Sequence, residues 1–257
     1  MTSPHDLMLA EDMGDFFDDP LGFVMYAYDW EHDPTLHVVE LPEPWATKFG
    51  MKYGPDQWAC EFLEEVGRQV RERDFDGRAP VEPQRHATAS GHGVGKSAVT
   101  GWLVNWIMST RPYSKGTVTA NTAPQLESKT WAEIAKWTRK CITGHWFNVS
   151  TGKGSMRVTH VQHPESWRCD AQTCREENSE SFAGQHAAGS SSWYIFDEAS
   201  AVPDIIWEVA EGGLTDGEPF IFAFGNPTRN RGKFFETFHR DRHRWTTRRV
   251  DSRTVQI

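Results

Sequence analysis

One segment of the chain combines residue types and spacing that suit phosphate binding: Ser-Gly-His-Gly-Val-Gly-Lys-Ser at 90–97. Its three alternate glycines allow a tight turn that aims several backbone N–H groups at one point. Lys96 adds a mobile positive charge for the β- and γ-phosphates of a nucleotide, and Ser97 offers a hydroxyl to Mg²⁺. The segment therefore predicts a loop that cradles a nucleoside triphosphate.

This segment matches the phosphate-loop pattern G-x-x-x-x-G-K-[ST] at seven of eight places. Ser90 stands where the first glycine is expected, and a side chain this small can fill the turn. The alternative is a glycine-rich turn that happens to precede Lys96. A strand before the loop and a helix after it favour the phosphate loop.

Two carboxylates supply the second half of a nucleotide-hydrolysing site. Asp197 and Glu198 follow directly on the apolar run 193–196, which is typical of a strand buried on both faces. Asp197 is expected to hold the Mg²⁺ shell, and Glu198 to polarise the attacking water as general base. The alternative is a helix cap formed by the two acids.

Strands alternate with helices along the chain, which predicts an α/β domain with a mostly parallel central sheet flanked by helices. Right-handed crossovers should bring the loop, the two acids and Asn226 together at the carboxyl ends of neighbouring strands. The predicted elements are helix 55–73, strand 85–89, helix 97–109, strand 117–120, helix 125–141, a β-ribbon over 146–171, strand 193–196, a helix around 205–209 and strand 220–224.

Two amides are candidate nucleotide contacts. Gln57 heads the helix before the first strand, where a glutamine reads the adenine edge in several P-loop ATPases, because an amide donates and accepts at once. Asn226 ends strand 220–224 and should face the nucleotide; its alternative is a turn residue before Pro227. The residues predicted to bind ATP are Gln57, Ser90, Gly91, His92, Gly93, Val94, Gly95, Lys96 and Ser97.

Composition sets the class of protein. The chain has 257 residues, 38% of them hydrophobic and 25% charged, which suits one large domain or a domain with an appendage. No apolar run approaches the ~20 residues that cross a bilayer, and the acidic N-terminus is no signal peptide. The four cysteines lack a metal-binding spacing and are expected to be reduced thiols of a cytosolic protein.

The net charge of −9 is distributed unevenly. Residues 1–50 hold eleven Asp and Glu against Lys48 alone, whereas residues 228–253 hold nine Lys and Arg against three Asp and Glu. A basic segment of this kind can follow a phosphate backbone. A solvated charged surface is the alternative, and the sequence leaves both open.

These motifs occur in an order that resembles the ATPase domain of the large terminase subunit of tailed bacteriophages. The resemblance rests on Gly91–Ser97, Phe196–Ala199 and Gly225–Thr228, with Asp19–Val24 and Gly54–Trp58 similar to the N-terminal region of that family. It implies a RecA-like P-loop NTPase fold of the additional-strand, catalytic-glutamate class. It also implies a motor that hydrolyses Mg-ATP to move double-stranded DNA into a procapsid.

The resemblance assigns roles to individual residues. Lys96 and Ser97 would contact phosphate and Mg²⁺, and Asp197 would be the carboxylate on the metal side. Glu198 would be the catalytic base, and Asn226 would sense the γ-phosphate. The implied partners are double-stranded DNA, the portal protein, the small terminase subunit and further copies in a ring, with a monomer in isolation. The implied place is the host cytoplasm, with no membrane.

The resemblance also sets the expected domain organisation and two departures from it. Residues 1–50 are expected to form an acidic, aromatic arm packed on an ATPase domain at 51–257, with a nuclease domain beyond the chain. Asp251 alone makes no two-metal nuclease site. Because the loop lacks an arginine, a transition-state charge is expected from Arg139, Arg229 or Arg231.

Two other functions share parts of this pattern. A nucleic-acid helicase or remodelling ATPase has the same nucleotide core, but it normally needs a second RecA-like domain. A GTP-binding switch would carry the guanine-reading motif N-K-x-D, which this sequence lacks.

Overall fold

An eight-stranded sheet forms the centre of the structure, a computed structural model that describes residues 3–152, 154–183, 185–187 and 189–256. The strand order is β3-β4-β5-β2-β6-β7-β1-β8, and every pairing is parallel except β3–β4 and β4–β5. The predicted mostly parallel α/β sheet is therefore confirmed. The strands are β1 (Gln84–Ser90), β2 (Lys115–Thr119), β3 (Phe147–Ser150), β4 (Arg157–His160), β5 (Arg168–Ala171), β6 (Ser192–Phe196), β7 (Phe220–Gly225) and β8 (Thr246–Val250).

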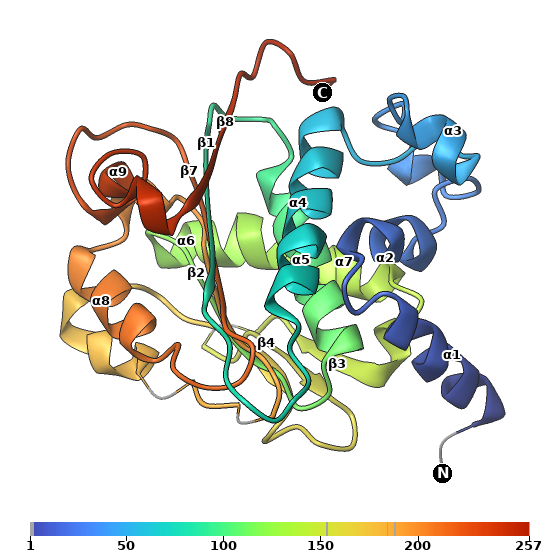
Figure 1. The fold of residues 1–257 in the computed structure, drawn as a ribbon, viewed down its shortest axis with the longest axis horizontal. Helices are drawn as coiled ribbons and strands as arrows, with labels where there is room; N and C mark the ends of the chain where they lie inside the picture. Colours follow the sequence, from blue (N-terminus) through green and yellow to red (C-terminus); the bar gives the residue numbers. More distant parts are fainter. Residues whose placement is uncertain (1–2, 153, 184, 188, 257) are drawn as a thin grey trace.

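Helices cover both faces of this sheet, with α4, α5 and α7 on one side and α8 and α9 on the other (Figure 1). Within the described ranges, none of them is both long and apolar enough for a bilayer crossing. The helices are α1 (Pro4–Asp15), α2 (Pro20–Ala27), α3 (Trp45–Phe49), α4 (Gln57–Arg73), α5 (Lys96–Thr110), α6 (Ala123–Gln125), α7 (Ala132–Lys140), α8 (Asp204–Gly212) and α9 (Lys233–Thr237).

The helix predicted over 125–141 differs from the expectation of one regular α-helix. A π-helical segment, Leu126–Trp131, separates α6 from α7. A π-turn holds one extra residue per hydrogen-bonded ring and is frequent at functional sites. Here it turns the buried Thr130 hydroxyl toward the end of β6.

Strand β7 shows how the two faces of the sheet are filled. Phe220, Phe222 and Phe224 pack with the core under α4 and α5, whereas Ile221 and Ala223 belong to the core under α8 and α9. Successive strand residues point to opposite faces, so a continuous apolar run suits a strand covered on both sides.

The N-terminal segment shares the larger of these cores. Leu21, Phe23 and Val24 in α2 are fully buried and belong to the same cluster as α4 and α5. The Trp30 ring lies 5.9 Å from both the Trp102 and the Trp137 ring centroids. The described part of this N-terminal segment therefore packs directly against the helix that follows the phosphate loop.

The cysteines form no disulfide, as their spacing predicts. All four, Cys60, Cys141, Cys169 and Cys174, are buried. Burial raises the pKa of each thiol above its ordinary value. These thiols therefore stay protonated and unreactive at neutral pH.

The strand order brings the candidate site together. Strand β7 lies between β1 and β6, which is the additional strand expected for this class of ATPase. The phosphate loop follows β1, Asp197 follows β6 and Asn226 follows β7. Because β1, β6 and β7 run parallel, these residues emerge at the same edge of the sheet.

A buried ion cluster fastens the opposite end of the helices to the sheet. Glu218, fully buried before β7, accepts from Arg111 at 2.6 and 3.0 Å and from Arg73 at 3.1 Å. Ser191 donates to the same carboxylate at 2.9 Å. Arg111 directly follows α5 and Arg73 ends α4, so one carboxylate holds both helices against β7.

We predict that Glu218→Gln lowers the free energy of unfolding by about 3–5 kcal/mol, because two arginines stay buried without a counter-charge. Urea unfolding measures the loss. The matched control is Glu40→Gln, which breaks a pair with Lys52 in which both side chains are about two-thirds exposed, and it should cost less than about 1 kcal/mol. Similar losses for both variants would contradict the role given to Glu218.

Acid should destabilise the fold through His86 of β1, whose ring packs against Phe62 and Phe222. Burial lowers the pKa of His86 to about 3. The unfolded chain takes up this proton near pH ~6.5 and the folded chain does not, so stability falls as pH drops below ~6.5. Between pH 7 and 5, wild type should lose about 2 kcal/mol more than His86→Leu. Parallel pH curves would disprove this.

Candidate nucleotide-binding site

The predicted strand–loop–helix unit is present around the phosphate loop. Strand β1 ends at Ser90, and α5 begins at Lys96. Gly93 and Gly95 have φ values of 74° and 85°, in the left-handed region that glycine enters without strain. A Cβ on Gly91 would lie 2.9 Å from Ser252 Oγ, so the loop also packs closely on the segment after β8.

The ammonium of Lys96 ties this loop to the neighbouring strand. Its Nζ donates to Ser90 Oγ at 2.9 Å, to the Gly91 carbonyl at 2.6 Å and to Asn226 Oδ1 at 3.1 Å. Burial lowers the pKa of Lys96, and the nearby Glu198 and Asp197 carboxylates oppose that shift. The cation is held by neutral oxygens and lies within electrostatic reach of both acids.

The two acids sit at the end of β6 in different environments. Asp197 is buried; its Oδ2 accepts from Thr130 Oγ1 at 2.5 Å, and its Oδ1 accepts from the Glu198 N–H at 3.0 Å. Glu198 is half-buried and has φ 50° and ψ 44°, a left-handed conformation. Such a conformation costs a non-glycine residue about 1–3 kcal/mol and is found mostly at functional sites.

Loop and acids line one cavity of about 560 Å³. Its lining comes from the loop residues His92 to Ser97, from residues between Gln125 and Glu133, and from Asp197 and Glu198. The Ser97 hydroxyl and the Asp197 carboxylate are oxygen donors, the ligand type that Mg²⁺ takes. The donor set therefore fits a magnesium-bound triphosphate.

Asn226 reaches across the end of the sheet. Besides accepting from Lys96, its amide nitrogen donates to His92 Nε2 at 2.8 Å. The side chain of Asn226 thus bridges two positions of the phosphate loop from strand β7, which the sequence predicted only as a residue facing the nucleotide.

Other predicted site residues lie elsewhere. Gln57 is exposed at the start of α4 and donates to Glu61 Oε1 at 3.0 Å, outside the residues that line the 560 Å³ cavity. Arg139 is exposed in the last turn of α7 and is also outside that lining. Arg229 and Arg231 line a separate cavity on the other side of the loop.

The structure adds two residues that the sequence did not single out, Lys129 and Thr130 of the π-helical segment. The exposed Lys129 lines the phosphate cavity, and Thr130 anchors Asp197. No sequence pattern distinguishes a π-turn from a regular turn of helix, so the sequence alone offered no signal for these two residues.

A smaller apolar cavity of about 200 Å³ adjoins the back of the loop. Val94, Gly95 and Ala98 line both cavities, and the rings of Trp30 and Trp102 line the apolar one. Its wall is fixed by Trp58, whose indole N–H donates to the Val94 carbonyl at 2.9 Å.

Fold and site together define a P-loop NTPase of the additional-strand class. In sequence, the chain is 31% identical over 155 residues to a protein named probable terminase, large subunit, of Enterobacteria phage P7. The match covers 60% of this chain and 31% of that relative, so the chain spans about a third of its length. No protein-family model matches.

Two solved structures with a similar fold are also large terminases. The large terminase of bacteriophage HK97 is similar with a TM-score of 0.53 at 11% identity, over 90% of this chain and 43% of that one. The large terminase of the thermophilic bacteriophage D6E gives a TM-score of 0.50 at 13% identity, over 66% and 40% of the two chains. At these identities the structures show a shared fold. With the sequence match, they confirm the predicted resemblance to large terminase subunits.

We predict that Trp58→Phe loosens the phosphate loop, because it replaces the indole with a phenyl ring that has no N–H to hold the Val94 carbonyl. The loss should be about 1 kcal/mol of stability, with faster amide exchange over residues 91–95. Trp102→Phe is the matched control, since the Trp102 N–H is buried with no hydrogen-bond partner in the described part of the chain. Equal exchange in the two variants would rule out the anchor.

Proposed function

We propose that this chain is the ATPase part of a DNA-packaging motor, which hydrolyses Mg-ATP to move double-stranded DNA into a procapsid. The observation that carries the proposal is the single cavity in which Lys96 faces Asp197 and Glu198. The sequence match to a probable terminase large subunit supports packaging rather than the helicase alternative.

The phosphates are proposed to bind on the loop. Backbone N–H groups between Gly91 and Lys96 would point at them, and the N-terminus of α5 would add its dipole. Lys96 would exchange its three neutral oxygen partners for phosphate oxygens, a stronger, charge-assisted contact. Ser97 and Asp197 would hold Mg²⁺, which supplies neutralisation of charge on the transferred phosphoryl group.

Glu198 is the proposed general base. It lies beside Asp197 at the rim of the cavity and is less buried, so it can accept a proton from a water molecule there. Its left-handed backbone turns it away from the direction that a regular continuation of β6 would give. Asn226 would report loss of the γ-phosphate, because it already contacts both Lys96 and His92.

The adenine is proposed to lie in the apolar cavity behind the loop. That cavity adjoins the phosphate cavity through Val94, Gly95 and Ala98, and aromatic rings line it. Gln57 lies between two of its lining residues, Asp56 and Trp58. A rotation of Gln57 away from Glu61 would let its amide read the edge of the base.

The charge that stabilises the transition state is proposed to come from Lys129 within the chain. It is the cation of the π-helical segment, and it lines the phosphate cavity. Arg139, Arg229 and Arg231 stay candidates for action on the nucleotide of a neighbouring copy in a ring. The proposed partners are the portal protein and the small terminase subunit. The proposed location is the host cytoplasm.

We expect Glu198→Gln to bind Mg-ATP with affinity close to wild type and to lose about 10²–10⁴-fold in turnover, the usual contribution of a general base. Phosphate release and equilibrium nucleotide binding measure the two effects separately. Glu133→Gln is the control, since Glu133 lines the same cavity but hydrogen-bonds Lys136 and Trp137. Unchanged turnover in Glu198→Gln, or an equal loss in both variants, would remove Glu198 as the base.

A further inference from the structure

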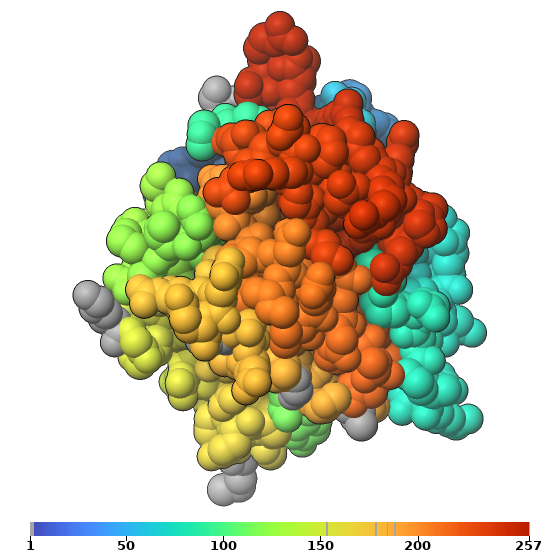
Figure 2. Space-filling model, turned by 90° about the vertical axis from the view of Figure 1, so that its left-hand side faces the viewer, coloured from blue at the N-terminus to red at the C-terminus, as the bar shows by residue number. Residues whose placement is uncertain are grey.

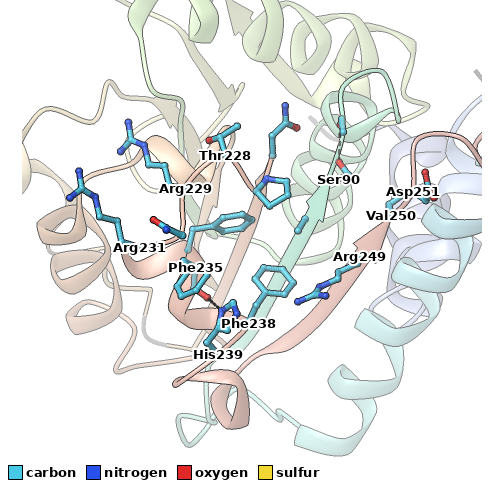
Figure 3. A pocket seen from close by; sticks show the side chains of 16 residues that line it. Ser90, Thr228, Arg229, Arg231, Phe235, Phe238, His239, Arg249, Val250 and Asp251 are labelled. Atoms are coloured by element: carbon cyan, nitrogen blue, oxygen red, sulfur yellow. Dashed lines mark hydrogen bonds between the residues drawn. The ribbon is translucent and has the colours of Figure 1, made fainter.

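A second large cavity, of about 1370 Å³, opens on the other side of the phosphate loop (Figure 3). It lies between the ends of β1, β7 and β8 and helix α9. The hydrolysis proposed above uses only the edge that this cavity shares with the phosphate loop and Asn226, and it leaves Arg229 and Arg231 as candidates for action on a neighbouring copy. Its lining has two notable components, a set of arginines and a set of aromatic rings.

The arginines leave positive charge uncompensated. Arg229 and Arg231, on the β7–α9 connection, and Arg249, on β8, are exposed. Among the described residues, none of the three forms an ion pair within 4.0 Å, whereas the other cavity-lining charge, Asp251, is paired with Arg253 at 2.5 Å. The cavity therefore presents cations from two sides and suits a polyanion.

Two aromatic rings of the cavity already contact other side chains, and one of these is a cavity arginine. The Arg249 guanidinium lies 5.8 Å from the Phe238 ring centroid. Phe235 stacks on His239, with ring centroids 3.7 Å apart and an angle of 18°. Because both rings already have a partner, the floor of the cavity orients charge more than it provides a platform for unpaired bases.

The segment that supplies most of the lining, residues 228–253, carries a net positive charge, with nine Lys and Arg against three Asp and Glu. The segment from the end of β7 to the C-terminus gathers on one face of the molecule, shown in red in Figure 2. The helices α1–α3, which belong to the acidic N-terminal segment, lie across the sheet from α9 in Figure 1. A long polyanion could lie along residues 228–253 without contacting the acidic N-terminal segment.

We propose that this cavity binds the phosphate backbone of duplex DNA, through Arg229, Arg231 and Arg249. Phosphates carry most of the affinity of such contacts and need no particular sequence. The three arginines stand on two different elements around an open hollow, so they can neutralise successive phosphates. The supported rings favour a duplex over a single strand.

The position of the cavity connects it to the nucleotide. Ser90, Gly91 and Asn226 line the basic cavity, and the same three residues hold Lys96, which lines the phosphate cavity. One wall therefore separates the two sites. A change in what Lys96 binds alters the wall that the DNA backbone would face; this coupling, unlike the DNA contact itself, rests on the proposed function.

The test is fluorescence anisotropy of the full chain with a labelled 30-bp duplex and with one labelled strand alone, at several salt concentrations and without nucleotide. The variants are Arg229→Gln with Arg231→Gln, and Arg249→Gln alone. The double variant should bind about tenfold or more weakly and lower the salt slope by about two, the single variant by about one. Thermal unfolding checks that the exposed substitutions leave the fold intact.

The control is Arg78→Gln with Arg157→Gln, two exposed arginines on other elements that give the same change in charge. Unchanged binding by the cavity variants, an equal loss in the control, or tighter binding of the single strand than of the duplex would each overturn the inference. Because no nucleotide is present, failure of ATP hydrolysis would contradict the proposed function and leave the DNA result standing.

Discussion

The site depends on one interaction, the hydrogen bonding of the Lys96 ammonium to three neutral oxygens. These oxygens come from the end of β1, from the loop and from Asn226 at the end of β7. A buried cation without a paired carboxylate is costly, which is why its pKa is lowered. The loop therefore suits a negatively charged ligand, because its oxygens would bind the Lys96 ammonium more strongly than the present neutral oxygens do.

The rest of the fold holds this arrangement in place. Parallel pairing of β1, β7 and β6 puts three chain segments at one edge of the sheet. Trp58 fixes the back of the loop, and the N-terminal segment packs against the helix that begins there. At the other end, the Glu218 cluster fastens α4 and α5 to β7. Rigid helices and strands thus support a loop that must meet a ligand accurately.

Local patterns predicted most of the fold, because strands buried on both faces read as apolar runs, as at 193–196 and 220–224, and because the phosphate loop has a pattern of its own. They did not predict the π-turn or the bridge from Asn226 to His92, which depend on side chains meeting across different elements. Gln57 shows the same limit: its place in the sequence was read correctly as a helix start, but the direction of its side chain is set by Glu61. The sequence also did not predict that the phosphate cavity and the basic cavity lie on either side of the same residues.

The most direct measurement is a crystal structure with Mg²⁺ and a non-hydrolysable ATP analogue. We expect the terminal phosphates on the amides between Gly91 and Lys96, the metal on Ser97 with Asp197 beside it, and Glu198 facing the γ-phosphate. Lys96 should have left at least one of its present oxygen partners. A polyphosphate bound away from the loop, or acids that point away from it, would contradict the account.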